Sequence, residues 1–210
     1  MTSNATCVSP VSATSNNISM TVNANVTSAI SIIANTGNTI CVGTNVIFTA
    51  TPVNGGVSPF YQWKKNGNNI GSNSNTYSNS TLANNEVISC EMTSNLTCST
   101  PVNAASNSIT MSVNNIVAPF VSIISNTGNL ICSGTNVIFT ATPTNGGTSP
   151  SYQWRKNGIN VGTNSNIYSD NTLILSDVIN CVMTSNASCA TTLTVTSSNI
   201  VMTVSPSLGS

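Results

Sequence analysis

The stretch Phe60-Tyr61-Gln62-Trp63-Lys64-Lys65-Asn66-Gly67 joins an alternating run of β-forming residues to an Asn-Gly pair. Asn-Gly tolerates positive φ at both positions and is the commonest signal of a tight β-hairpin. The same pattern returns 91 residues later, at residues 151–158. A hairpin that recurs at a fixed spacing predicts an all-β chain built from tandem units.

The spacing of 91 residues holds far beyond the hairpin. Residues 31–38 return as residues 122–129, and the following pairs align without a gap: Cys41 with Cys132, Tyr77 with Tyr168, Cys90 with Cys181, and Cys98 with Cys189. We therefore expect two full repeats, at residues 26–116 and 117–210. Residues 18–22 match residues 109–113, so residues 1–25 are expected to be the C-terminal two-strand portion of a preceding repeat, in an excerpt of a longer array.

Short apolar runs separated by Gly, Pro and Asn clusters predict seven or eight strands per repeat, as in a Greek-key β-sandwich. In the first repeat we expect strands at residues 29–33, 45–51, 60–65, 75–82, 86–94 and 108–113. Asn-Gly pairs begin at residues 54, 66, 145 and 157 and are interpreted as hairpin turns.

Charged side chains are scarce, at 4% of the chain, with four basic residues, four acidic residues and no histidine. Too few cations are present for nucleic-acid binding, and histidine-ligated metals and Ser-His-Asp triads are excluded. The four acids sit singly along the sequence, and Asp170 and Asp177 are too few for a calcium cage. We therefore expect no enzymatic activity, no cofactor and no metal site. No apolar run is long enough for membrane insertion.

Each repeat resembles the immunoglobulin-like superfamily. Residues 43–50 look like the second strand of that family, residues 61–67 like its third strand with the core tryptophan, and residues 82–90 like the approach to its sixth-strand cysteine. The resemblance implies that Trp63 and Trp154 lie in the core. Ala50 and Ala141 stand where the family has its second-strand cysteine, so the usual inter-sheet disulfide is impossible.

A closer resemblance is to the immunoglobulin-like modules of very large surface proteins in Bacteroidetes, which the type IX secretion system exports. Their Ile-Cys-x-Gly-Thr motif is matched at residues 40–44 and 131–135, and their Thr-Pro-x-Asn-Gly-Gly-x-Ser-Pro motif at residues 51–59 and 142–150. In that family such modules act as spacers in adhesins, gliding proteins and extracellular fibres. The resemblance therefore implies a structural role.

The seven cysteines form no Cys-x-x-Cys motif, and one interpretation is that all are unpaired. Cys90 and Cys181 fit this interpretation as buried thiols. In the sandwich that the resemblance implies, Cys41 and Cys98 lie at opposite ends of one repeat, too far apart to bond. In a tandem array, the end of one repeat that carries Cys41 meets the end of the next repeat that carries Cys189. We therefore predict a Cys41–Cys189 disulfide. Cys7, Cys98 and Cys132 are left to bond with modules or chains outside this sequence, in an oxidising space.

Together these features predict the shaft of a secreted cell-surface adhesin or extracellular filament, for attachment, gliding or prey capture. Its expected partners are neighbouring repeats, other copies in a homo-oligomeric fibre, and a surface or glycan ligand. The alternative is a module that binds a glycan or host protein, for example on Trp63 and Trp154 or the basic pairs at residues 64–65 and 155–156. A remote alternative is an ice-binding protein with a threonine-rich face.

Overall fold

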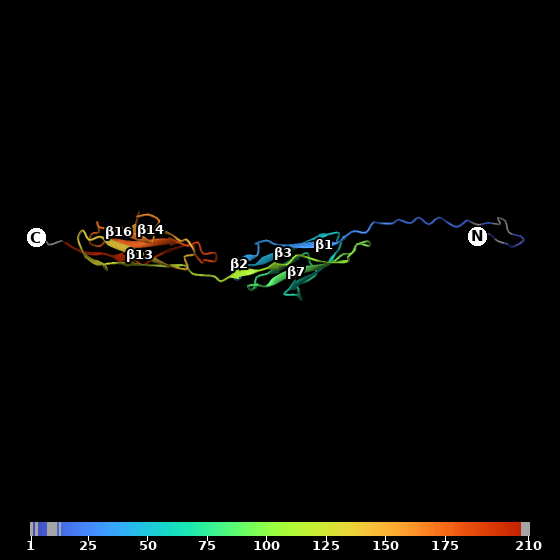
Figure 1. The fold of residues 1–210 in the computed structure, drawn as a ribbon, viewed down its shortest axis with the longest axis horizontal. Helices are drawn as coiled ribbons and strands as arrows, with labels where there is room; N and C mark the ends of the chain where they lie inside the picture. Colours follow the sequence, from blue (N-terminus) through green and yellow to red (C-terminus); the bar gives the residue numbers. More distant parts are fainter. Residues whose placement is uncertain (1, 3, 8–11, 13, 207–210) are drawn as a thin grey trace.

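The computed structural model describes residues 2, 4–7, 12 and 14–206. Regular structure in this part of the chain consists of β-strands, which gather in two units that lie end to end, with residues 14–25 extending from the first unit (Figure 1). A helix capable of crossing a membrane is not found among the described residues. We call the unit with β1 to β10 the first module and the unit with β11 to β20 the second module.

The strands of the two modules follow the same order. Those of the first module are β1 (Ala29–Ala34), β2 (Thr39–Cys41), β3 (Val46–Val53), β4 (Phe60–Lys65), β5 (Asn68–Ile70), β6 (Thr76–Asn79), β7 (Val87–Thr93), β8 (Asn103–Ala105), β9 (Ile109–Thr110) and β10 (Ser112–Asn114). Those of the second module are β11 (Phe120–Ser125), β12 (Leu130–Cys132), β13 (Val137–Thr144), β14 (Ser151–Lys156), β15 (Ile159–Val161), β16 (Ile167–Asp170), β17 (Val178–Thr184), β18 (Thr194–Thr196), β19 (Ile200–Val201) and β20 (Thr203–Ser205).

Each module is an immunoglobulin-like β-sandwich of two packed sheets, as the sequence predicts. In the first module, the sheet β1-β3-β6 packs against the sheet β5-β4-β7-β8, to which β9 adds by pairing with β7. The short strand β2 leaves the first sheet and runs parallel to β10. The described strands are shorter and more numerous than the seven or eight expected, because β2, β5 and β8 are not among the predicted ranges and the last predicted strand is divided into β9 and β10.

The core of each module comes from the alternation of buried and exposed residues along its strands. In β3, for example, Val46, Phe48 and Ala50 point inward and are at most 3% exposed. Phe48 lies with its ring centroid 6.3 Å from that of Trp63. Such aromatic pairs contribute about 1 kcal/mol beyond their buried area. The second module repeats this arrangement around Trp154.

The predicted turn at Asn66-Gly67 is confirmed: both residues have positive φ, 51° and 81°, and they join β4 to β5. The interpretation of Asn54-Gly55 as a hairpin turn is wrong. The loop at residues 54–59 carries the chain from β3 in one sheet to β4 in the other. The same correction applies to Asn145-Gly146 in the second module.

Residues 14–25 differ from the expectation of two strands. They form no ladder, and Ile18, Met20 and Val22 are 80%, 81% and 91% exposed. Met111, the counterpart of Met20, is 1% exposed in the core of the first module. A strand is stable only beside a second strand, and this segment has none in the described part of the chain. The expectation for residues 1, 3, 8–11 and 13 lies outside the described residues.

Candidate functional site

The candidate site is the junction at which the first module meets the second. At its first-module end, β10 pairs with β2, and the N–H of Val42 donates to the carbonyl oxygen of Asn114 at 2.9 Å. At its second-module end, the N–H of Val117 donates to the carbonyl oxygen of Cys189 at 2.9 Å, and Thr191 donates back to Val117 at 2.9 Å. The linker between Asn114 and Val117 is thus held at both ends by backbone hydrogen bonds.

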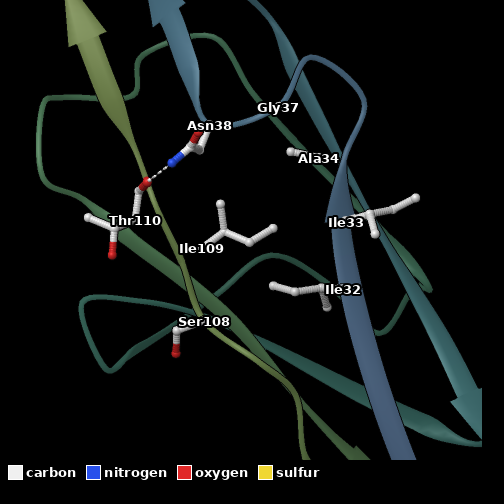
Figure 2. A pocket seen from close by; sticks show the side chains of 8 residues that line it. All are labelled: Ile32, Ile33, Ala34, Gly37, Asn38, Ser108, Ile109 and Thr110. Atoms are coloured by element: carbon white, nitrogen blue, oxygen red, sulfur yellow. Dashed lines mark hydrogen bonds between the residues drawn. The ribbon is translucent and has the colours of Figure 1, made fainter.

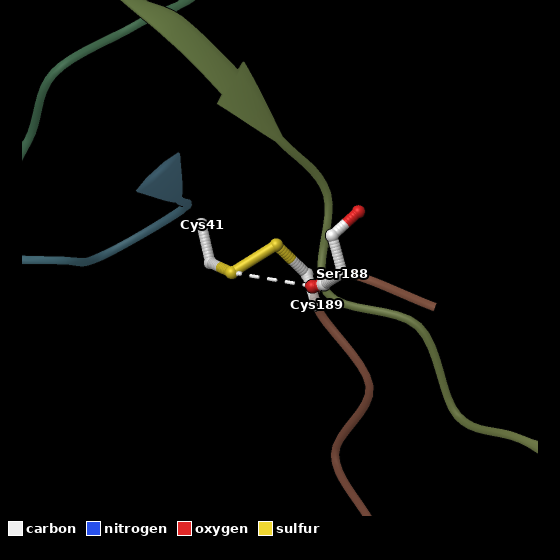
Figure 3. Close-up of a disulfide and its surroundings, with 3 residues drawn as sticks. All are labelled: Cys41, Ser188 and Cys189. Atoms are coloured by element: carbon white, nitrogen blue, oxygen red, sulfur yellow. Dashed lines mark hydrogen bonds between the residues drawn. A yellow bond between two sulfur atoms is a disulfide. The ribbon is translucent and has the colours of Figure 1, made fainter. Parts of the chain in front are cut away.

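A disulfide crosses the same junction and contains the pair that was predicted (Figure 3). Cys41 ends β2 of the first module, whereas Cys189 lies in the loop after β17 of the second module. Their Cα atoms are 5.7 Å apart, within the range for a disulfide, and 148 residues separate them in sequence. Two covalent connections, the linker and the disulfide, therefore join the two modules, which lie end to end.

The repeated Asn-Gly-Gly sequence builds the second-module side of this junction. The Asn145 amide donates at 2.9 Å to the carbonyl oxygen of Ala118, the residue after Val117. Gly147 has φ of +88°, and a Cβ atom there would lie 2.1 Å from Oδ1 of Asn186. The loop at residues 145–147 can therefore close on the loop that carries Cys189. Sequence reasoning missed this role, although the recurrence of Asn-Gly-Gly in both repeats was the available signal.

The three cysteines that were expected to bond outside this sequence are free thiols, and two of them lie at the outward ends of the modules. Cys98 is half-buried at the far end of the first module, and Cys132 is exposed at the far end of the second. Cys7 is also exposed. The structure contains no bond from Cys41 to Cys98, in agreement with the predicted placement of these two residues at opposite ends of one module.

Cys90 and Cys181 are buried free thiols inside the two cores, both 0% exposed. Burial raises the pKa of each thiol to about 11, because the thiolate loses its hydration there. Reactivity depends on the thiolate, so these two cysteines are inert packing groups.

The charged residues form ion pairs in both modules, which corrects the expectation that the acids sit singly. Lys65 lies 2.8 Å from Glu86 in the first module. In the second module, Asp170 and Asp177 converge on Lys156, at 3.0 Å and 3.2 Å. Lys64 forms a further ion pair with Glu91, whereas the Arg155 guanidinium donates a hydrogen bond to the neutral Asn160 side chain.

Burial opposes ionisation of Asp170, but hydrogen bonds from Thr172, Lys156 and Tyr168 outweigh it and lower the pKa of this carboxyl to about 2. The pKa of Asp177 is also lowered, because hydrogen bonds from Ile174, Asn157 and Lys156 outweigh its burial. Both groups are therefore charged at neutral pH and act as structural partners of Lys156. Groups of three or more metal-ligating side chains are absent from the described residues.

The side chains considered for sugar stacking are not available for it. Trp63 and Trp154 are 0% exposed, and their indole N–H groups donate to the carbonyl oxygens of Ser74 and Ser165 at 2.9 Å.

A groove of about 570 Å³ lies between β1 and β9 (Figure 2). It is lined by uncharged residues: Ile32, Ile33, Ala34, Gly37, Asn38, Ser108, Ile109 and Thr110.

No family model matches the chain. No curated protein matches it. The chain is similar to the fibronectin(III)-like modules of CbhA from Clostridium thermocellum, with 14% sequence identity and a TM-score of 0.40, over 82% of this chain and 94% of that one.

Proposed function

We propose that this chain is part of the shaft of a secreted, cell-surface adhesin or extracellular filament, as in the large Bacteroidetes surface proteins that its motifs resemble. The observation that carries the proposal is the double connection at the junction. Two sandwiches that are free to reorient need only a flexible linker between them and no second covalent bond. A module pair whose relative orientation is fixed by Cys41–Cys189 suits a part that must keep its direction and carry load.

The disulfide also limits how far the chain extends under tension. Force applied at the two ends passes through Cys41 and Cys189 and bypasses the residues between them. That closed loop corresponds to a separation of 148 residues, or about 500 Å of extended chain at roughly 3.5 Å per residue. Unfolding of β4 or β14 under load then adds no length to the shaft.

An extracellular location follows from the same bond in this proposal. Disulfides persist in oxidising compartments and are reduced in most cytosols. A surface of neutral amides and hydroxyls, with only 4% charged residues, has little like-charge repulsion and suits close packing of repeated modules. Immunogold labelling of the source cells with an antibody against this chain tests the location. Label on thin extracellular fibres is expected, and label confined to the cell interior overturns the proposal.

The mechanical part is tested by pulling the whole chain from its two ends in an optical trap. The oxidised chain is expected to lack the extension step that belongs to residues 42–188. Reduction, or the Cys41→Ser variant, restores about 500 Å of extension at roughly 3.5 Å per residue. Equal extension in the oxidised and reduced chains overturns a load-bearing role for the bond. A glycan array with the same chain is expected to show no binding.

A further inference from the structure

We propose that the outward ends of the two modules repeat the two sides of the junction already described. Through these ends, a second copy of this chain binds head to tail. The first-module end of one copy, with Cys98, meets the second-module end of the next copy, with Cys132. A disulfide between these two cysteines closes the joint. The inference rests on the proposed shaft function for its biological role, but not for its geometry.

The first-module end has the same construction as the side of the junction that Cys189 occupies. Val26 donates to the carbonyl oxygen of Cys98 at 2.9 Å, and Thr100 donates to Val26 at 2.8 Å. The Asn54 amide donates to the carbonyl oxygen of Thr27 at 2.7 Å. Each of these bonds has its counterpart in the second module 91 residues later, around Val117 and Cys189. The half-buried Cys98 is therefore held as Cys189 is held.

The second-module end has the construction of the side that Cys41 occupies. β12 runs parallel to β20 just as β2 runs parallel to β10. Ser133 donates to the carbonyl oxygen of Ser205 at 3.0 Å, which matches the bond from Val42 to Asn114. Cys132 ends β12 and is exposed. Both halves of the observed joint are thus present, one at each end of the molecule.

Space for the second copy requires a change in one segment. In the head-to-tail joint, Ser205 of the incoming copy takes the place that Asn114 has in the observed junction. In the free first-module end, the equivalent place belongs to Asn23, which lines a cleft of about 240 Å³ together with Cys98. Residues 14–24 take part in no ladder, so they can turn aside while the hydrogen bonds of Val26 stay in place.

The chemistry of the bond is a thiol–disulfide exchange with oxidised glutathione as the oxidant. The two protein thiols lose two protons and two electrons and form one S–S bond. The disulfide of glutathione accepts both and leaves as two molecules of reduced glutathione. Cys90 and Cys181 take no part, because they are buried.

The test uses the full chain in a Cys7→Ser background, so that Cys98 and Cys132 are the two accessible thiols. Oxidation with glutathione disulfide is expected to give a ladder of chain multiples on a non-reducing gel, which reductant abolishes. Chymotrypsin cleaves beside the exposed Phe120, between the two cysteines in sequence. Mass spectrometry is then expected to find Cys98 peptides linked to Cys132 peptides.

Two single variants in the same background sharpen the result. Cys98→Ser and Cys132→Ser are each expected to lose the ladder, whereas an equimolar mixture of the two is expected to give dimers and no larger species. The matched control is Cys98→Ser/Cys132→Ser with Cys7 retained, which reports oxidation of an exposed thiol outside any such joint. Linkage of Cys98 to Cys98 as often as to Cys132, or chains that are only capped by glutathione, would overturn the inference. If the gel shows no ladder but immunogold labels extracellular fibres, this inference is wrong and the proposed function is retained.

Discussion

Lys156 Nζ lies 3.0 Å from Oδ2 of Asp170 in the second module. The first module has Asn79 at the position of Asp170, and Lys65 there pairs with Glu86 instead. The two modules have the same strand order but differ in the number of carboxylates around this lysine. Their responses to acid are therefore expected to differ.

The first prediction concerns acid stability and Asp170. Its pKa in the folded chain, about 2, is lower than the ordinary value of 3.8. A carboxyl with a lowered pKa stabilises the fold above its unfolded pKa, and the contribution is lost as the pH falls through the folded value. The Asp170→Asn variant, which copies the first module, should lower the free energy of unfolding by about 2 kcal/mol at pH 7. In urea titrations the difference should shrink as the pH falls from about 5 and disappear near about pH 1, below both pKa values; a deficit that does not shrink over this range would contradict the account.

The second prediction concerns Gly147. Gly147→Ala should destabilise the second module by about 2–4 kcal/mol, because the new Cβ combines strain at positive φ with a clash against Asn186. Gly134→Ala is the matched control: its φ is +80°, and nothing lies within 4 Å of the added Cβ. That variant should lose only about 1 kcal/mol. Thermal unfolding of the two variants separates the clash from the strain, and equal losses would show that the clash is relieved without cost.

The third prediction concerns the rigidity of the junction. The two cores share no residue, so Cys41→Ser should leave both modules folded. Without the bond, the modules should tumble with separate, shorter correlation times in backbone ¹⁵N relaxation. Cys98→Ser removes the first-module counterpart of Cys189, which forms no bond within the described chain, and should retain one common correlation time. If Cys41→Ser also tumbles as one body, the linker hydrogen bonds alone fix the orientation.

The fourth prediction concerns thiol reactivity. At pH 8, iodoacetamide should modify Cys98 and Cys132 while Cys90 and Cys181 react at least about a hundredfold more slowly, because burial and a pKa of about 11 suppress the thiolate. Mass spectrometry over a time course measures the four rates. Denaturant should make all four alike, and rapid labelling of Cys90 in the folded chain would mean that the core opens readily.

The fold was predictable from the sequence where side-chain alternation is local. The alternating residues of β3 and β4, with Tyr61 and Trp63 buried in β4, place both strands within two residues of their observed bounds. The strand β2 was missed because its three residues carry no alternation of their own. Its formation depends on the parallel pairing with β10, more than 70 residues away, and such non-local pairing leaves little trace in a local pattern.

The junction was predictable in part. The Cys41–Cys189 pair follows from sandwich topology and the order of the repeats, but the side chains that hold the linker do not. Asn145 looks like a turn residue in the sequence, because Asn-Gly is so often a hairpin turn. Its amide instead donates to the carbonyl oxygen of Ala118, 27 residues earlier in the chain. The convergence of Asp170 and Asp177 on Lys156 was missed for a similar reason, since the three residues come from different elements.

The Cys41–Cys189 bond has a consequence for proteolysis. A peptide bond broken anywhere from residue 42 to residue 188 leaves the two ends of the chain joined through sulfur. The exposed loops, such as the one that carries Val57 at 99% exposure, lie inside this span. An enzyme that nicks such a loop therefore cuts the backbone without parting the shaft. Damage at the surface and failure of the fibre become separate events.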